Sequence, residues 1–237
     1  PRKNIVSVAG KPLIYYSIRA ARESKLLDAF IVSTDDEEIA EVAKSYGADV
    51  PFKRPRETAE TFSAEIEYQQ HAIDWLEKNR GWKPELAVMI KPTSPLRPAS
   101  VIDEVIEFCN KNPQYSMVTT TCPPPFHPYR MSRLKEDGKT LEPILPDMVR
   151  KTDFNIWGGY VPTQKLPEVW AHNTIVDAIP VNRIKEGTAA IFSGPIGSVK
   201  TEPTLSVDID YPEDLKLVEQ LIISQEQLRM KNENKGK

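Results

Sequence analysis

The stretch ELAVMIKPTSPLRPASVIDEVIEFCNKNPQYSMVTTT, residues 85–121, decides the fold. It begins with the apolar run 85–90, which is typical of a strand that is buried on both faces. Residues 100–112 then carry apolar side chains at helical spacing behind Ser100, a residue type that caps helix N-termini. A second β-rich run follows at 116–121. A strand, a helix and another strand in this order predict a unit of a parallel sheet.

The residues before this unit repeat the alternation. The elements they predict are helices at 11–24, 35–47 and 62–79 and extended pieces at 29–34 and 49–53. An amphipathic helix behind a basic turn, here Arg2-Lys3-Asn4, follows a buried strand and a Gly-rich phosphate loop in nucleotide-binding domains, so we expect both before residue 1. The predicted fold class is therefore α/β, with a doubly wound, mainly parallel sheet.

Capping residues mark the ends of the helix at 35–47. Thr34 with Glu37, or Asp35 with Glu38, gives the pattern of a capping box at its start. Gly47 suits the C-terminal stop, because glycine adopts the left-handed conformation that ends many helices.

The alternation breaks after residue 121. Residues 122–173 are rich in proline and lack a helical period, which predicts an inserted arm of hairpins and extended segments that acts as a lid or a dimerisation arm rather than a decorative loop. The core, which includes residues 1–121, resumes over 174–230. Its predicted elements are extended runs at 174–180, 189–194 and 204–210 and a helix from Pro212 to about Met230, before a solvated tail at 231–237.

Composition narrows the classes of function. The chain has 237 residues, 31 Lys and Arg against 34 Asp and Glu, and a formal net charge of −3, so nucleic acid is not the expected partner. Two cysteines far from CxxC spacing favour a reducing cytoplasm over a disulfide framework or a zinc site. No apolar run approaches the roughly 20 residues of a membrane span, so no membrane partner is expected. The 21 prolines and 10 glycines indicate rigid loops.

Asp208 and Asp210 form the clearest chemical pair. They stand two apart at the end of an apolar run, so a period of two places both carboxylates on one face. Ligands of open α/β sheets bind beyond the carboxyl ends of strands, and Mg²⁺ with a phosphate would relieve the repulsion between two carboxylates. The alternative is that Asp210 caps the following helix while Asp208 is merely exposed.

The turn KPTSPLRPAS, residues 91–100, lies at the end of another predicted strand. Its three prolines fix a turn that presents Thr93, Ser94, backbone amides and Arg97. Such a rigid polar platform suits a base or a ribose, and the alternative is a rigid loop without a ligand.

Basic residues gather near the expected phosphate loop. Arg2 and Lys3 adjoin it, and cationic side chains of this kind stabilise phosphoryl groups. The amide of Asn4 both donates and accepts, so it could contact a base edge. Lys11 and Arg54 are further basic residues, of a kind that more often lies on solvated surface.

These segments together resemble the acylneuraminate cytidylyltransferase family, the CMP-sialic acid synthetases and their relatives. The matching segments are PRKNI and GKPLI at the start, residues 31–55, KPTSPLR at 91–97, HPYRM at 127–131 and SVDIDYPEDL at 206–215. The resemblance implies a nucleotide-diphospho-sugar transferase-like fold. It also implies a homodimer in which an inserted arm helps to build the neighbour's sugar site. The implied reaction uses CTP and Mg²⁺ to convert an acidic nine-carbon sugar, a nonulosonate, into a CMP-sugar with release of pyrophosphate.

The resemblance also implies roles for single residues. The catalytic group comprises Lys3, Asp208 and Asp210, and the two aspartates are the metal ligands. The nucleotide-binding residues are Arg2, Lys3, Asn4, Arg54, Lys91 and Ser94. The sugar-binding residues are Tyr129 and Asn173.

Two alternatives remain open at this stage. The family usually has Gln where this chain has Lys91, and residues 173–177 match poorly the strand usual in the family. Both differences are compatible with a related transferase that uses another nucleotide or another sugar. A non-catalytic homologue that serves as a binding module is the second alternative.

Overall fold

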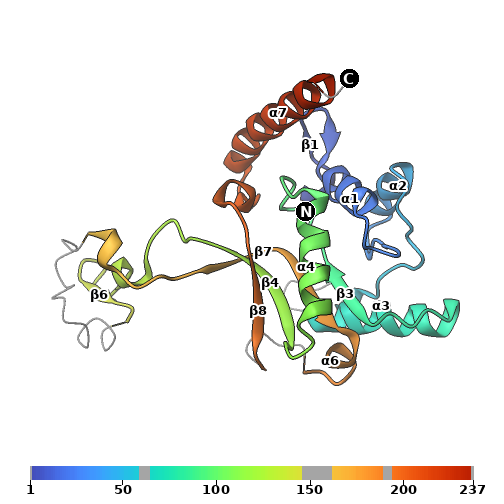
Figure 1. The fold of residues 1–237 in the computed structure, drawn as a ribbon, viewed down its shortest axis with the longest axis horizontal. Helices are drawn as coiled ribbons and strands as arrows, with labels where there is room; N and C mark the ends of the chain where they lie inside the picture. Colours follow the sequence, from blue (N-terminus) through green and yellow to red (C-terminus); the bar gives the residue numbers. More distant parts are fainter. Residues whose placement is uncertain (1, 59–64, 146–161, 189–193, 236–237) are drawn as a thin grey trace. The chain divides into compact units, whose positions relative to one another are not determined.

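The computed structural model describes residues 2–58, 65–145, 162–188 and 194–235. The chain divides into two compact units, which we describe separately (Figure 1). The first unit contains residues 1–121 and 173–237, and the second contains residues 122–172. No helix of the described residues is both long and apolar enough to cross a membrane.

A four-stranded mixed sheet forms the centre of the first unit, in the order β3-β7-β4-β8. Its strands are β3 (Leu86–Met89), β4 (Met117–Cys122), β7 (Ala171–Pro180) and β8 (Ile196–Lys200). β4 and β8 are parallel, with Met117 opposite Ile196, whereas β3 and β7 are antiparallel, with Leu86 opposite Pro180. The α/β class is confirmed, but the sheet is mixed rather than mainly parallel.

β7 lies beside β4 in the sheet, and the inserted second unit connects the two strands. β4 ends at Cys122 and β7 begins at Ala171, so the chain leaves the sheet and returns to it at the two ends of the second unit. The Thr119 hydroxyl donates to Asp177 (2.6 Å) and the Thr120 hydroxyl to the Val176 carbonyl (3.4 Å), so residue numbers rise along β4 as they fall along β7. β7 is therefore antiparallel to β4 as well as to β3.

The predicted helices are present, with ends that differ by a few residues. They are α1 (Leu13–Glu23), α2 (Glu37–Ser45), α3 (Glu65–Arg80), α4 (Ala99–Lys111) and α7 (Pro212–Lys235). The short helix α6 (Val181–Lys185), which follows β7, was not predicted. Asp36, rather than Thr34 or Asp35, caps α2 by accepting from the Ile39 amide (3.1 Å). Gly47 follows α2 with a φ of 83°, as predicted. Ser100 lies inside α4, whose N-cap position is Pro98.

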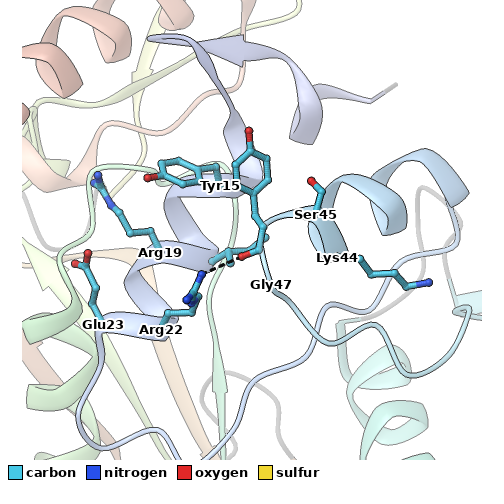
Figure 2. A pocket seen from close by; sticks show the side chains of 9 residues that line it. Tyr15, Arg19, Arg22, Glu23, Lys44, Ser45 and Gly47 are labelled. Carbon is cyan, nitrogen blue, oxygen red and sulfur yellow. Dashed lines mark hydrogen bonds between the residues drawn. The ribbon is translucent and has the colours of Figure 1, made fainter.

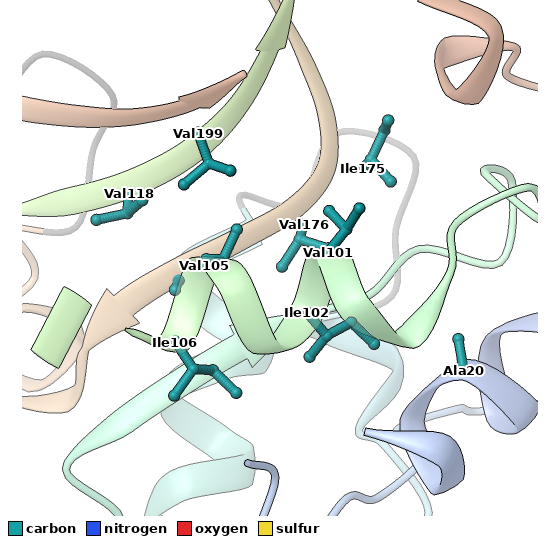
Figure 3. Packing of buried hydrophobic residues seen from close by; sticks show 10 residues of the cluster. Ala20, Val101, Ile102, Val105, Ile106, Val118, Ile175, Val176 and Val199 are labelled. Atoms are coloured by element: carbon teal, nitrogen blue, oxygen red, sulfur yellow. The ribbon is translucent and has the colours of Figure 1, made fainter. Parts of the chain in front are cut away.

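The largest apolar cluster packs α4 against the sheet. Figure 3 shows its side chains gathered around α4; they are Ala20, Val101, Ile102, Val105, Ile106, Val118, Ile175, Val176, Ala178 and Val199. Burying a side chain of the Val or Ile type contributes roughly 1.5–3 kcal/mol. This cluster packs β4 and β7 against α4, the helix that follows the turn.

Several predicted strands are extended without forming ladders. Residues 29–34 and 49–53 make two parallel bridges, Ile31 with Asp49 and Thr34 with Lys53. Residues 204–210 are not a strand: a 3-10 helix, η6 (Pro203–Ser206), precedes an extended segment. Most of the predicted run at 189–194 lies outside the described residues.

The shorter elements complete both units. In the first unit they are η1 (Lys3–Ile5), β1 (Ser7–Val8), β2 (Lys11–Pro12) and η2 (Arg56–Thr58), and β1 pairs with β2. The second unit contains η3 (Pro128–Arg130), the antiparallel pair β5 (Ser132–Leu134) and β6 (Leu141–Pro143), and η5 (Thr163–Lys165).

Candidate active site

The two aspartates lie on one exposed face of the extended segment before α7. Ile209 between them is buried (2% exposed) and packs with Val8, Leu96 and Val218, whereas Asp208 and Asp210 are exposed. The alternation predicted from the sequence is therefore present, although the segment is not a ladder strand. A buried anchor between two exposed carboxylates directs both toward solvent.

Lys3 lies beside this pair. Its ammonium donates to the Ile209 carbonyl (2.7 Å) and stands 3.7 Å from a carboxylate oxygen of Asp210. It is carried by η1, which also includes Asn4. Residues more than two hundred positions apart therefore meet, and the basic start of the chain supplies a cation to the aspartate pair.

The proline-framed turn reaches the same place. The Ser94 side chain is buried, and its hydroxyl donates to Asp208 (3.3 Å). The Ile209 amide donates to the Thr93 carbonyl (3.1 Å), so the backbone joins the two segments as well. Ser94, Lys3, Asp208 and Asp210 are thus brought together, as an active site would require.

Arg97 does not lie on the exposed platform that the sequence predicted. It is 4% exposed, and its guanidinium donates to the Ile175 carbonyl (2.7 Å), the Ser17 hydroxyl (2.8 Å) and the Lys91 carbonyl (3.2 Å). Burial lowers the pKa of Arg97 to about 9, and the negative charge of Asp208 acts in the opposite direction. The prediction that Arg97 is presented on the turn was wrong, because its acceptors come from three separate parts of the chain that the local sequence does not bring together.

Arg2 and Arg54 lie at the start of α2. Arg2 pairs with Asp36 (3.1 Å) and with Glu38, and Arg54 pairs with Asp35 (3.4 Å). The pKa of the Asp36 carboxyl lies below its usual value, chiefly because the Ile39 amide donates to it. Desolvation opposes this shift, and the hydrogen bond and charge of Arg2 add to it. These acidic partners were not predicted, because acidic residues are also typical of a solvated helix N-terminus.

Lys91 forms an ion pair with Glu65 of α3 (2.6 Å). Burial acts to lower the pKa of Lys91, but the hydrogen bond and the charge of Glu65 outweigh it, so the pKa lies above its usual value. Glu65 was not predicted as a site residue. A charged pair therefore stands at the end of β3.

Asn173 joins β7 to the segment before the aspartates. Its amide nitrogen donates to the hydroxyls of Thr201 and Ser206 (2.8 Å each), and its buried amide oxygen has no hydrogen-bond partner among the residues that the structure describes. Tyr129 belongs to the second unit, where its ring meets His127 edge to face (4.9 Å). A role of either residue in binding a sugar stays a prediction.

A separate hollow of about 600 Å³ lies between α1 and α2 (Figure 2). Its lining includes Tyr15, Arg19, Arg22 and Tyr46, and none of the predicted site residues. Arg22 donates to the Tyr46 carbonyl (3.3 Å), which stabilises the end of α2. This hollow is therefore distinct from the aspartate pair.

The aspartate pair has the donor chemistry for a magnesium ion. Mg²⁺ binds through one or two carboxylates and keeps several waters and phosphate oxygens, which two exposed carboxylates allow. In the described part of the chain no three His, Cys, Asp or Glu side chains converge on a possible metal position. Asp208 and Asp210 therefore fit a site shared with a phosphate ligand better than an all-protein cage.

Comparisons with known proteins show which proteins this chain resembles. A pseudaminic acid cytidylyltransferase of Campylobacter jejuni is 36% identical over 107 residues, which are 45% of this chain and 46% of that protein, so this match spans less than half of the relative. The CMP-N,N'-diacetyllegionaminic acid synthase of Legionella pneumophila is 31% identical over 96% of this chain and 93% of its own length.

A solved structure shows the same fold at low sequence identity. CMP:2-keto-3-deoxy-manno-octonic acid synthetase, solved in complex with CTP, has a TM-score of 0.63 and 12% identity, with 94% of this chain and 92% of that chain covered. The family model described as cytidylyltransferase matches residues 1–125. With this match across the turn at 91–97 and the Legionella match along nearly the whole chain, the protein belongs to the cytidylyltransferase family.

Proposed function

We propose that this protein transfers CMP from CTP to an acidic nine-carbon sugar of the nonulosonate class and releases pyrophosphate. The observation that carries the proposal is the meeting of Lys3, Ser94, Asp208 and Asp210 at one exposed place in a chain of this family. The relatives named for pseudaminic and legionaminic acid support the sugar class.

The proposed chemistry depends on charge and position. The anomeric hydroxyl of the sugar would form a bond to the α-phosphorus and lose its proton to solvent water, while the bond from this phosphorus to pyrophosphate breaks. Asp208 and Asp210 would hold Mg²⁺, which when bound would neutralise phosphate charge and help pyrophosphate to leave. The Lys3 ammonium beside Asp210 would neutralise the same phosphates.

The other nucleotide-binding residues would have to exchange partners. Arg2 is 57% exposed and pairs with acidic side chains of α2. Exposed ion pairs contribute at most about 1 kcal/mol, so a triphosphate can compete with these carboxylates for Arg2. We assign Asn4, Arg54 and Lys91 to the nucleotide on the resemblance alone.

The Lys91–Glu65 pair favours one variation of this proposal. A charged pair at the end of β3, where the family usually has glutamine, presents different groups to a base or a sugar. A related transferase that uses another nucleotide or another sugar is therefore our second candidate. Tyr129 and Asn173 are the proposed sugar contacts in either case.

We further propose that the protein acts as a homodimer through its second unit. Exposed apolar side chains of this unit support the proposal, namely Phe126, Leu134, Leu141 and Ile144. The neighbour's arm would then help to close the sugar site.

Pyrophosphate release tests the activity. The natural protein, with any residues that precede Pro1, is incubated with Mg²⁺, each of CTP, GTP, UTP and ATP, and pseudaminic, legionaminic or N-acetylneuraminic acid. We expect release with CTP and at least one sugar. Release with another nucleotide only would favour the second candidate, and no release with any pair would favour the non-catalytic alternative.

Single substitutions test the metal ligands. Asp208→Asn keeps an oxygen that can accept from Ser94 but removes the charge, so we expect turnover to fall by at least about 100-fold with the melting temperature nearly unchanged. Asp210→Asn should act in the same direction. Asp74→Asn, at an exposed position of α3, is the matched control and should retain the original rate. Wild-type turnover in both site variants would refute the assignment.

A further inference from the structure

Arg97 carries a positive charge that the described structure buries without a carboxylate partner. Its three acceptors, at Ser17, Lys91 and Ile175, are neutral oxygens, and within the described part of the chain its buried Nε atom has no hydrogen-bond partner. No ion pair of Arg97 occurs among the described residues. The buried guanidinium is therefore a costly group at this position.

Stability alone does not account for an arginine here. Removing a guanidinium from water carries a large free-energy cost, and apolar residues of similar volume often replace buried charged groups without loss of stability. Burial accordingly lowers the pKa of Arg97, and Asp208 is the charged group that opposes this effect. The position of Arg97 relative to the aspartate segment indicates another role.

The guanidinium joins three separate parts of the first unit. It contacts α1 through Ser17, the end of β3 through the Lys91 carbonyl and β7 through the Ile175 carbonyl. The Lys91 carbonyl also accepts from the Ser94 amide (3.4 Å). Arg97 and Ser94 therefore share one acceptor, and Ser94 in turn donates to Asp208.

A second connection runs through β7. Ile175 stands two residues after Asn173, which donates to Thr201 and Ser206 just before the aspartates. The segment that carries Asp208 is thus held on two sides by residues near the backbone acceptors of Arg97: Ser94 lies three residues after Lys91, and Asn173 lies two residues before Ile175.

We propose that Arg97 is a positioning residue: its buried guanidinium fixes the turn at 91–94 and β7, and thereby holds Ser94 and Asp208 in place for the nucleotide and its metal. The inference rests on the proposed cytidylyltransferase function. Arg97 itself touches no substrate in this scheme.

Two variants of Arg97 and one of its acceptor test the proposal. Arg97→Met removes all three hydrogen bonds, and Arg97→Lys keeps the charge without the planar fork. Ser17→Ala removes one acceptor of Arg97 together with the hydrogen bond that the Ser17 hydroxyl donates to the Lys91 carbonyl (3.2 Å). With CTP and Mg²⁺, we expect turnover at saturating substrate to fall about 100-fold in Arg97→Met, because small displacements of reacting groups have effects of this size. Arg97→Lys and Ser17→Ala should fall less, and all three should need more Mg²⁺ for half-maximal rate.

Hydrogen exchange provides a readout that does not depend on activity. The amides of Ser94 and Ile209 donate to the Lys91 and Thr93 carbonyls, and we expect both to exchange faster in the three variants while amides of α3 stay unchanged. Unchanged turnover, Mg²⁺ requirement and exchange in the folded variants would overturn the proposal, and Ser17→Ala decides the matter if neither Arg97 variant folds. If the wild-type protein releases no pyrophosphate, the proposed function fails, whereas the exchange rates still test whether Arg97 fixes the turn.

Discussion

Thr174 adopts a left-handed backbone conformation within β7, with a φ of 47°. Such a conformation is strained for a β-branched residue. The two amides that follow, of Ile175 and Val176, both donate to the Thr120 hydroxyl (3.1 and 3.2 Å). These two hydrogen bonds therefore compensate locally for the backbone strain at Thr174. The neighbouring Asn173 makes the contacts with the segment before the aspartates.

Thr174→Gly should release this strain. The left-handed conformation destabilises a non-glycine residue by about 1–2 kcal/mol. Glycine avoids this strain but loses more chain entropy on folding, which costs roughly 0.5–1 kcal/mol of stability. We expect the free energy of unfolding in urea to stay equal or to rise by up to about 1 kcal/mol. Gly47→Ala is the opposite control, because Gly47 has a φ of 83° and an added Cβ would lie 3.3 Å from Arg22, so it should destabilise. A clear loss of stability in Thr174→Gly would show that the side chain outweighs the strain.

Single residues also show how far the sequence could predict the site. The period of two at Asp208 and Asp210 needed only local geometry, and the structure places both on one face. The burial of Arg97 depends on Ser17 and Ile175, which are far away in the chain, so no local pattern contained it. Ser94 was predicted to face a nucleotide, and its contact with Asp208 was not foreseen.

At the scale of elements, the cap at the start of α2 makes the stability of this helix depend on pH. Asp36 accepts from the Ile39 amide, and this bond, followed by Arg2, lowers the pKa of the carboxyl below 3.8. A group with a lowered pKa in the folded state contributes stability that is present above the unfolded pKa and is lost as the pH falls through the folded pKa. The cap therefore stabilises the helix at neutral pH and weakens in acid.

Asp36→Ala should lower the melting temperature at pH 7, and its difference from the wild type should shrink as the pH falls below 3.8. Asp36→Asn is the matched control, because an amide oxygen also caps helices but does not titrate, so it should retain most of the stability at neutral pH. Thermal unfolding followed by circular dichroism measures both. An equal loss in the two variants would mean that the ion pair with Arg2, rather than the cap, is responsible.

Helices were predicted better than strands, and the reason is physical. The amphipathic periods of α1 and α2 and the capping residues of α2 are local, so the ends of both helices fall within a few residues of the prediction. A strand needs a partner whose position the local sequence does not contain. Of the predicted strand at 204–210, residues 204–206 belong to the 3-10 helix η6, and the extended remainder meets the turn through the Ile209 amide, which donates to the Thr93 carbonyl. β7 runs opposite to the direction expected of a mainly parallel sheet.

At the scale of the whole molecule, exposed apolar side chains of the second unit are the feature that bears on the proposed dimer. Leu134 and Leu141 stand opposite each other on β5 and β6 and are 55% and 62% exposed. An exposed apolar pair on a two-stranded hairpin is poorly placed in a monomer, because such hairpins have little stability of their own. A partner that covers this pair would stabilise both the hairpin and the dimer.

The double change Leu134→Glu and Leu141→Glu should therefore convert a dimer into a monomer, since two carboxylates cannot be buried together in an apolar contact. Sedimentation should give about twice the 26.8 kDa of the chain for the wild type and once this mass for the variant. Leu228→Glu on α7, at a position that is 60% exposed, is the control and should leave the dimer intact. If the arm completes the neighbour's sugar site, the monomer should also show a raised KM for the sugar at an unchanged KM for CTP. A monomeric wild type, or a dimer that survives the double change, would remove the second unit from the interface.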